Sequence, residues 1–468
     1  MVMIAFDKVC RQLEKSILSE KASASFVCGG TIPIKQLEAS SNSGTEKIKD
    51  TTVKSSDPVT IYWDAKPNDP EEAHKLILPG NGSDDIARSA SKLQQLVSAC
   101  EPAGFGQGKK TVMDTEYRSA GKLEPSRFAT TFHPAEFGII DSIEQILVPQ
   151  LNLMNEELLA VRRVELELYK LNIYSGPSGI FKKHVDTPRS KSQIGSLVVC
   201  LPSEFEGGNL IVRHNENEAD FDWQRQSAEA IQWAAFYSDC EHEIKTINRG
   251  QRITLTYNLY VIEPVSKKFS PISLLDPTSS PLYADLKLIL SMPGFLKQGG
   301  NLGIFCSHSY PHTAENAREL LPHGLKGVDL LLYAALHSFG LKVEVLPVIV
   351  KNSYWDDDED HVGDSDGSSD SDEYYQYQQI CEGVYVGVEL WKERSTDNGE
   401  NESLRNVSTS SRLIIQGNWP QREFKKPVTW ISAPIHEKNA LTYLAYRNEA
   451  SVGHLYSSAA IIATIPPW

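Results

Sequence analysis

The chain has 468 residues, which exceeds one typical domain and predicts two or three. Its formal net charge of −15 argues against a broad phosphate-binding surface, so we expect no nucleic-acid partner. We expect no membrane partner, because no stretch approaches the roughly 18 apolar residues of a membrane span and no secretory signal pattern begins the chain. The seven cysteines form no Cys-x-x-Cys pair, which favours a reducing compartment, either cytoplasmic or nuclear.

Residues 1–160 are predicted to form a mainly helical N-terminal region. Helical patterns occur at residues 9–20, 84–99 and 139–162, and Pro149 is expected to kink or split the last of them. The glycine-rich segment of this region fails the spacing of a phosphate loop, so we assign it no chemistry.

Residues 161–263 are predicted to form a β-rich domain. Polar and apolar residues alternate from residue 168 onward, which places Tyr174 on a polar face. Residues 194–201 and 231–237 are apolar, β-branched runs of the kind found in buried strands. The pattern favours a small barrel, in which strands distant in sequence become neighbours.

Two histidines and one aspartate of this domain have the residue types of a metal centre. His184 and Asp186 are two residues apart, so both side chains point to the same side of an extended segment. His242 follows just beyond an apolar run. Two imidazoles and one carboxylate can bind one face of an octahedral ferrous ion and leave the opposite face open. The sequence therefore predicts a non-haem iron oxygenase site.

A cationic residue with a suitable neighbour follows the last histidine. Arg252 and Thr254 are again two residues apart, so both are expected to point inward from one strand. A guanidinium can bind the far carboxylate of 2-oxoglutarate through two hydrogen bonds, and the threonine hydroxyl can add a further contact. These residues predict a co-substrate site beside the metal.

Residues 264–468 are predicted to form a C-terminal α/β region. Its expected elements are a strand at 303–306, a helix at 328–339, a strand at 342–349 and an apolar tail from residue 459. The Asp/Ser-rich run at about 355–377 repels itself and is expected to be a disordered acidic loop.

Residues 164–260 resemble the double-stranded β-helix (jelly-roll) domain of the prolyl 4-hydroxylase-like Fe(II)/2-oxoglutarate-dependent dioxygenases. The resemblance is carried by His184-Val-Asp, by Phe236-Tyr-Ser-Asp-Cys-Glu-His-Glu and by Arg252-Ile-Thr-Leu-Thr-Tyr, and it is strongest to fungal members. It implies an α+β fold with this oxygenase core, N-terminal helices and a C-terminal α/β region.

The resemblance also implies roles for single residues. His184, Asp186 and His242 are the implied iron ligands and catalytic residues. Arg252 stands where collagen-type enzymes use lysine for the co-substrate carboxylate. Tyr174 is similar to a tyrosine that helps to hold 2-oxoglutarate, although its spacing to the His-x-Asp motif is one residue longer. The Glu-Gly-Gly turn of the family is matched at residues 206–208.

The implied activity is hydroxylation of a substrate with release of succinate and CO2. The implied cofactors are Fe(2+), 2-oxoglutarate as co-substrate and O2, with ascorbate as a further candidate. Peptidyl proline follows from the resemblance alone, and a small molecule or another protein side chain stays open as the substrate. Two alternatives to the oxygenase remain: a catalytically inactive barrel that binds a ligand or partner, and a cupin with a different metal.

Several polar residues near these motifs have two interpretations. Arg189 could orient Asp186 or touch substrate, or it could be an exposed loop arginine. A core tyrosine is the alternative for Tyr174. Asp239 could hydrogen-bond a ligating imidazole, but a solvated carboxylate is expected, and His214 is expected to be a surface residue. His308, Tyr310 and His312 are expected to form a local polar cluster rather than a metal site.

Overall fold

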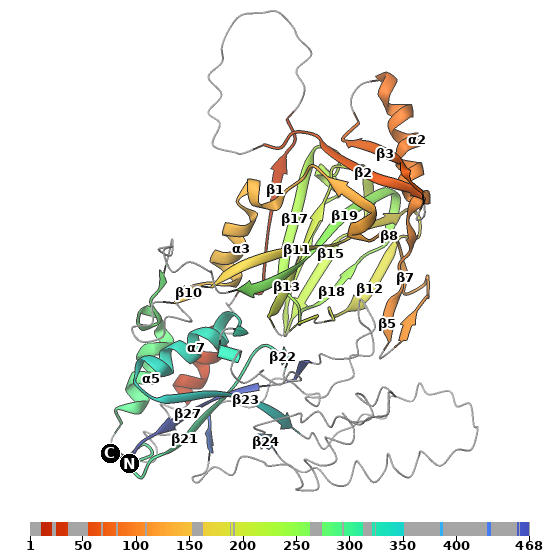
Figure 1. The fold of residues 1–468 in the computed structure, drawn as a ribbon. Coiled ribbons are helices and arrows are strands. Elements are labelled where there is room, and N and C mark those ends of the chain that lie inside the picture. Colours follow the sequence, from red (N-terminus) through yellow and green to blue (C-terminus); the bar gives the residue numbers. More distant parts are fainter. Residues whose placement is uncertain are drawn as a thin grey trace, which may run out of the picture.

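The structure is a computed structural model. It describes residues 11–20, 25–35, 55–66, 69–80, 83–107, 110–151, 162–187, 189–190, 192–262, 274–292, 294–311, 321–322, 324–350, 384–386, 428–431, 456–457 and 459–467. Two antiparallel β-sheets form the centre of the fold, and a second layered unit built mainly from the C-terminal part lies beside one end of them (Figure 1).

The larger central sheet has the strand order β1-β17-β13-β19-β11-β8-β4, and β14 also pairs with β19. All of these pairings are antiparallel. The strands are β1 (Val27–Pro33), β4 (Glu101–Pro102), β8 (Gly121–Leu123), β11 (Arg163–Ser175), β13 (Gln193–Cys200), β14 (Phe205–Gly207), β17 (Ala230–Tyr237) and β19 (Ile247–Ile262). Every residue of β13 and β17 is buried, as their mostly apolar sequences predict.

The smaller central sheet has the order β16-β15-β18-β12-β7, also antiparallel. Its strands are β7 (Arg118–Ser119), β12 (Ile180–His184), β15 (Leu210–His214), β16 (Asn217–Phe221) and β18 (Glu241–Ile244). Side chains from both sheets, such as Leu197 and Phe236 of the larger and Phe181 and Val212 of the smaller, belong to one hydrophobic core. Because the two sheets share this core, inward-facing polar residues of either sheet are kept from water.

The described part of residues 1–160 contains more strands than the sequence predicts. The helix α2 (Ser83–Ala99) confirms one expected helix. The helix α3 (Ile139–Leu147) confirms only the first part of the helix expected at 139–162, because the chain forms a strand at 150–151, just after Pro149. The further strands are β2 (Val59–Lys66), β3 (Asp69–Leu78), β5 (Phe105–Gln107), β6 (Lys110–Val112), β9 (Phe128–Thr130) and β10 (Gln150–Leu151). Short 3-10 turns lie at η1 (Pro125–Arg127) and η2 (Pro134–Phe137). Most of these strands have only two or three residues, which is too short for an alternating pattern to be recognised.

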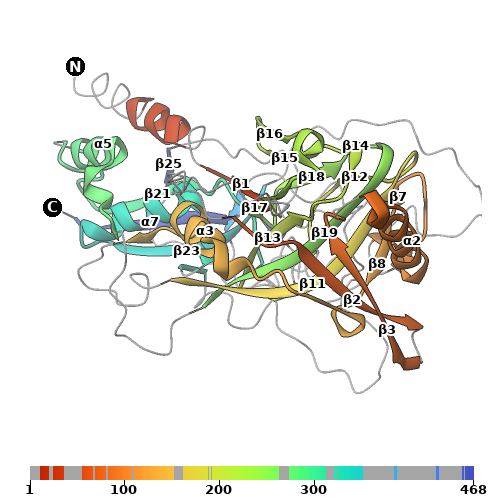
Figure 2. The same cartoon turned by 90° about the horizontal axis from the view of Figure 1, so that it is seen from above.

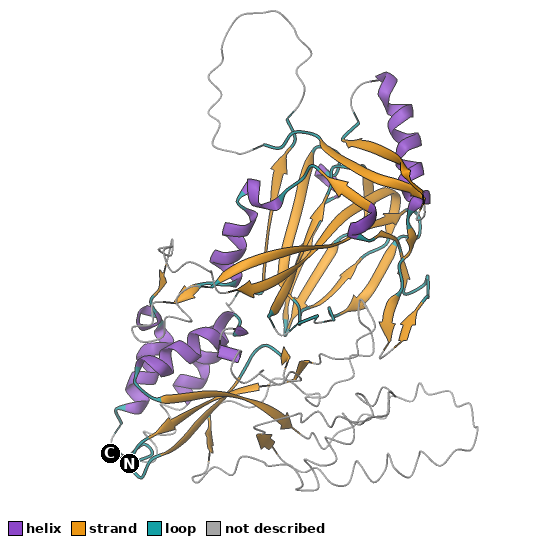
Figure 3. Cartoon of the chain, in the orientation of Figure 1, coloured by secondary structure: helices purple, strands orange, loops and turns teal. Residues whose placement is uncertain are grey.

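The C-terminal region builds a separate sheet of order β24-β23-β27-β21-β25 (Figures 2 and 3). Its elements are β21 (Gly300–Phe305), β23 (Lys342–Val350), β24 (Val384–Val386), β25 (Val428–Trp430), β27 (Ala459–Ile465), α5 (Pro281–Leu290) and α7 (Gly327–Ser338). Smaller elements are β20 (Leu274–Leu275), β22 (Tyr310–Pro311), β26 (Tyr456–Ser457), η3 (Gln224–Gln226) and η4 (Pro277–Ser279). The four C-terminal elements expected from the sequence are therefore confirmed.

A second hydrophobic core lies in this C-terminal unit. The helix of residues 11–20 contributes Leu13 and Ile17 to it, so the two ends of the chain share one core. The acidic run at 355–377 lies outside the described residues. Among the described helices, none is both long and apolar enough to cross a membrane.

Candidate active site

The structure brings the three predicted metal ligands together between the two central sheets. His184 is the last residue of β12 and lies directly opposite His242 of β18 in the antiparallel register. Asp186 follows two residues later, with Oδ1 3.7 Å from His242 Nε2. The three side chains are buried, and their donor atoms all lie within 4.8 Å of one another. This spacing would let one metal ion reach all three side chains.

Backbone carbonyls fix the orientation of both imidazoles. His184 Nδ1 lies 2.8 Å from the Lys182 carbonyl, and His242 Nδ1 lies 3.1 Å from the Cys240 carbonyl. Because a carbonyl only accepts hydrogen bonds, each Nδ1 is the donor, and Nε2 is the ring nitrogen left for a metal. Burial, and then the neighbouring His242, holds the pKa of His184 well below its usual range. A neutral imidazole with a free Nε2 is the form that binds a metal.

The carboxylate of the cluster is also held in place. Ser196 of β13 donates a hydrogen bond to Asp186 Oδ2, and Asp186 Oδ1 faces His242. The rings of His184 and His242 are tilted by 55° with centroids 4.1 Å apart, so their planes converge rather than run parallel. Outer hydrogen bonds of this kind usually orient metal ligands. The donor set therefore fits a ferrous ion bound on one face.

Arg252 is the second strong feature of the site. Its side chain is 0% exposed, and no described residue accepts a hydrogen bond from its Nε, Nη1 or Nη2 atoms. Burial lowers the pKa of the guanidinium below its ordinary value. A buried, charged donor without an acceptor is costly, so such an arrangement points to a ligand that supplies the acceptors. A carboxylate matches the fork of the guanidinium.

Tyr174 and Thr254 are both buried close to Arg252, and Tyr174 is also part of the hydrophobic core. Tyr174 is directly opposite Arg252 in the β11–β19 pairing, is 2% exposed and has its ring centroid 5.9 Å from the guanidinium carbon. The Trp223 ring lies 5.1 Å from the same carbon. The Thr254 hydroxyl, two residues along β19, is buried and donates to the Asn172 carbonyl at 3.4 Å. Aromatic rings thus border the guanidinium, and a hydroxyl lies on the same face of its strand.

Gly208 forms part of the wall around Arg252 and provides a test of it. Its φ is +71°, and an added Cβ would lie 2.0 Å from Ile247 Cδ1 and 3.3 Å from Arg252 Cδ. Gly208→Ala should therefore lower the free energy of unfolding by more than the about 1–2 kcal/mol that a left-handed backbone costs an alanine. It should also raise the KM for 2-oxoglutarate, because Arg252 must shift.

The matched control is Gly138→Ala, which has φ +72° but nothing within 4 Å of an added Cβ. In a denaturant titration, this variant should lower the free energy of unfolding only by the cost of the left-handed backbone. It should leave the KM for 2-oxoglutarate unchanged. Equal effects of both variants on stability and KM would show that Gly208 does not hold Arg252 in place.

Arg118 is a site neighbour that sequence reasoning missed. Its guanidinium carbon lies 4.2 Å from the centroid of Phe181, whose ring stacks on His184 at 3.5 Å. Arg118 donates to the Gly104 carbonyl and to Asn172 Oδ1. It belongs to the two-residue strand β7, so no motif or periodicity marks it. Its contacts make it a support for the ring beside His184.

The structure also shows how exposed three other residues near the predicted motifs are. The Arg189 guanidinium is exposed and lies 4.2 Å from the Tyr169 ring centroid. The expectation that Asp239 is solvated was wrong, because its side chain is only 5% exposed. The expectation that His214 is a surface residue was also wrong, since its side chain is 10% exposed and its ring stacks on His308. The sequence could not show this, because His308 comes from the C-terminal region.

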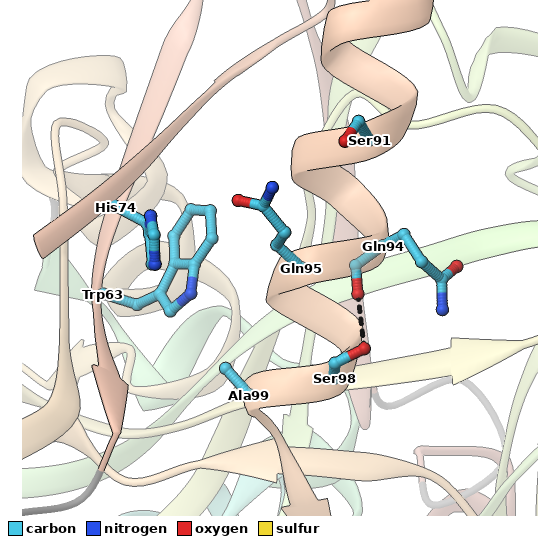
Figure 4. A pocket seen from close by; sticks show the side chains of 7 residues that line it. All are labelled: Trp63, His74, Ser91, Gln94, Gln95, Ser98 and Ala99. Carbon is cyan, nitrogen blue, oxygen red and sulfur yellow. Dashed lines mark hydrogen bonds between the residues drawn. The ribbon is translucent and has the colours of Figure 1, made fainter.

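A separate cavity of about 390 Å³ lies between α2 and the β2–β3 hairpin (Figure 4). Its lining residues are Trp63, His74, Ser91, Gln94, Gln95, Ser98 and Ala99. They come from the N-terminal part of the chain and include none of the residues described above. The cavity is therefore distinct from the candidate site.

Comparisons with known proteins agree with the chemistry of this site. Residues 169–260 match the family model described as the 2OG-Fe(II) oxygenase superfamily. Among curated proteins, no relative matches the chain. The matched segment contains all six predicted site residues: Tyr174, His184, Asp186, His242, Arg252 and Thr254.

Solved structures with local similarity include several oxygenases. A prolyl-4-hydroxylase from Pseudomonas putida is 17% identical, and the aligned region covers 37% of this chain and 84% of the hydroxylase chain, with a TM-score of 0.23. A prolyl hydroxylase from Trichoplax adhaerens, solved with a hypoxia inducible factor peptide, is 13% identical over 54% and 91%, with a TM-score of 0.25. An oxidoreductase of the 2OG-Fe(II) oxygenase family from Burkholderia pseudomallei is 14% identical over 39% and 82%, with a TM-score of 0.22.

Proposed function

We propose that this 2-oxoglutarate-dependent dioxygenase, whose domain of the 2OG-Fe(II) oxygenase superfamily spans residues 169–260, hydroxylates a prolyl residue of a peptide or protein. Its cofactors are ferrous iron, 2-oxoglutarate and O2. Bound together, they supply the oxidative decarboxylation that yields succinate, CO2 and a hydroxylated product. A small-molecule substrate is the second candidate, since the site residues bind the co-substrate and not the group to be hydroxylated.

The observation that carries the proposal is the pairing of a metal-binding triad with an unsatisfied buried cation. His184, Asp186 and His242 would hold the iron, with each imidazole binding through Nε2. Arg252 would bind the far carboxylate of 2-oxoglutarate, because none of its guanidinium nitrogens has an acceptor among the described residues. A metal site alone would leave that buried charge unexplained.

The remaining predicted residues have supporting roles in this proposal. Tyr174 and Thr254 would contact the co-substrate beside Arg252, which their positions in the β11–β19 pairing support. The two central sheets exclude water from the site, as an oxidising reaction requires. A barrel that only binds a partner is less favoured, because it has no need for both the triad and the unpaired guanidinium.

We also propose that the two central sheets form a double-stranded β-helix. Their antiparallel pairing around one core supports it. The division into residues 1–160, 161–263 and 264–468, and a cytoplasmic or nuclear location, remain proposals that the sequence supports.

A peptide assay tests the prolyl substrate. Iron-loaded protein is incubated with 2-oxoglutarate, O2 and a library of proline-containing peptides, and succinate and peptide mass are measured. We expect succinate release above the peptide-free background, together with the gain of one oxygen atom on the peptide. Matched peptides with alanine in place of each proline should give background release. Equal stimulation of succinate release by both peptide sets would exclude proline as the target and favour the small-molecule candidate.

A further inference from the structure

A second cluster of potential metal ligands lies where the C-terminal region meets the oxygenase domain. His214 of β15, Asp239 of the turn between β17 and β18, and His308 after β21 have donor atoms within 4.8 Å of one another. Asp239 and His308 are almost completely buried, and the cluster joins residues nearly 100 positions apart in sequence.

Two observations argue against a metal ion in this cluster. The rings of His214 and His308 are nearly parallel, at 12°, with centroids 4.0 Å apart. A metal binds in the plane of an imidazole, and two stacked planes do not meet at a common point. In addition, the Lys326 ammonium lies 2.7 Å from Asp239 Oδ1, so a cation already neutralises this carboxylate.

We propose that the C-terminal region positions His242, the third iron ligand, by holding the turn that precedes it. Asp239 is the point of attachment. Lys326 Nζ donates to its Oδ1, while the Ser309 backbone N–H at 2.9 Å and His308 Nδ1 at 3.1 Å donate to its Oδ2. All three donors belong to the C-terminal region, so both carboxylate oxygens are held from there. The inference rests on the proposed function, in which His242 binds iron.

The turn transmits this attachment to the imidazole. Cys240, the residue after Asp239, is fully buried, and its carbonyl accepts the hydrogen bond that orients His242 through Nδ1. At the start of the turn, the Tyr237 hydroxyl accepts from the Gly327 N–H and donates to the Leu147 carbonyl. The segment between Tyr237 and His242 is therefore tied to the C-terminal region at two points.

Electrostatics make the attachment sensitive to the loss of one partner. Burial alone would raise the pKa of Asp239, but the charges of Lys326 and His308 hold it well below its usual range. The carboxylate therefore stays ionised. Removing one partner from a buried ion pair leaves an uncompensated charge. The carboxylate then either takes up a proton or moves toward water, and both changes weaken the attachment of the turn.

The experiment uses the full chain and measures iron affinity, with 2-oxoglutarate present, by anaerobic titration of the visible charge-transfer band. Lys326→Met should weaken iron binding about 10-fold, the size of effect typical for residues that orient a metal ligand. Lys326→Arg should restore most of the affinity, because it keeps the charge. His308→Phe keeps the ring stacking but loses the hydrogen bond to Asp239. This variant replaces Lys326→Met in the experiment if Lys326→Met does not fold.

The matched control is Leu286→Ala, which removes a fully buried side chain from the C-terminal core without touching Asp239. It should lower the melting temperature and leave iron affinity unchanged. Iron affinity in the lysine or histidine variant that stays within the error of the wild type would overturn the inference. Absence of the band in the wild-type protein would instead overturn the proposed function, so the two failures are distinguishable.

Discussion

Asp186→Asn is expected to weaken ferrous iron binding by more than about 100-fold, because even residues that only orient a metal ligand contribute 10- to 100-fold. Asparagine keeps the shape of the side chain and can still accept the Ser196 hydrogen bond, but it removes the one negative charge of the donor set. Succinate formation should fall in parallel. The measurement is an anaerobic iron titration followed by a succinate assay.

The same variant should be at least as stable as the wild type when metal is absent. A carboxylate buried in the core without a metal ion raises the free energy of the metal-free fold, and asparagine removes that charge. The control is Glu144→Gln, which removes the charge of a buried carboxyl that pairs with Arg163 at 3.0 Å. It should lose stability and keep iron affinity. Iron binding that survives in Asp186→Asn would contradict the assigned ligand set.

Arg252→Met should raise the KM for 2-oxoglutarate by at least roughly 30-fold, since loss of a buried, charge-assisted contact costs about 2–5 kcal/mol. Iron affinity without co-substrate should stay unchanged, because Arg252 is not in the metal cluster. Arg252→Lys keeps the charge but not the two-pronged geometry, so an intermediate KM is expected. Steady-state succinate formation as a function of 2-oxoglutarate concentration measures the KM of both variants.

Stability distinguishes a ligand-binding arginine from a structural one. Arg252 has no hydrogen-bond acceptor among the described residues, so Arg252→Met should leave the free energy of unfolding unchanged or raise it. Arg162 is equally buried but donates to the Leu325 carbonyl, so Arg162→Met should lower the free energy of unfolding. If Arg252→Met destabilised the fold and left the KM unchanged, Arg252 would be a structural residue.

The central site was predictable because its information is local. The period of two along a strand places His184 beside Asp186 and Arg252 beside Thr254, and both pairs lie on strands or at strand ends in the structure. The distant His242 was predicted from its residue type and its place after an apolar run, and the family resemblance implies the same role. The β12–β18 pairing brings it opposite His184. The roles assigned to these residues remain predictions.

Other parts could not be read from the sequence, because they depend on long-range packing. Strand β1 pairs with β17 about 200 residues away, and its two glycines lower its strand propensity. These glycines are required by close contacts: an added Cβ at Gly29 would lie 2.7 Å from the Trp233 carbonyl oxygen, and one at Gly30 2.9 Å from Trp233 Nε1. The sequence shows the glycines but not the tryptophan that they accommodate.

The contacts of Asp239 show the same limit for a charged residue. An aspartate two residues before a glutamate, in a turn, has the sequence of a solvated segment. Its burial results from Lys326 and His308, which only the docked C-terminal region supplies. Local composition therefore predicted the wrong environment, because the neutralising charge lies 87 positions away.

The most direct test of the oxygenase site is an anaerobic titration of the purified wild-type protein with ferrous iron and then 2-oxoglutarate. The site described here predicts a visible metal-to-ligand charge-transfer band that appears only when both are present and that is lost in Asp186→Asn. A folded protein that binds iron but develops no band on addition of 2-oxoglutarate would contradict the assignment.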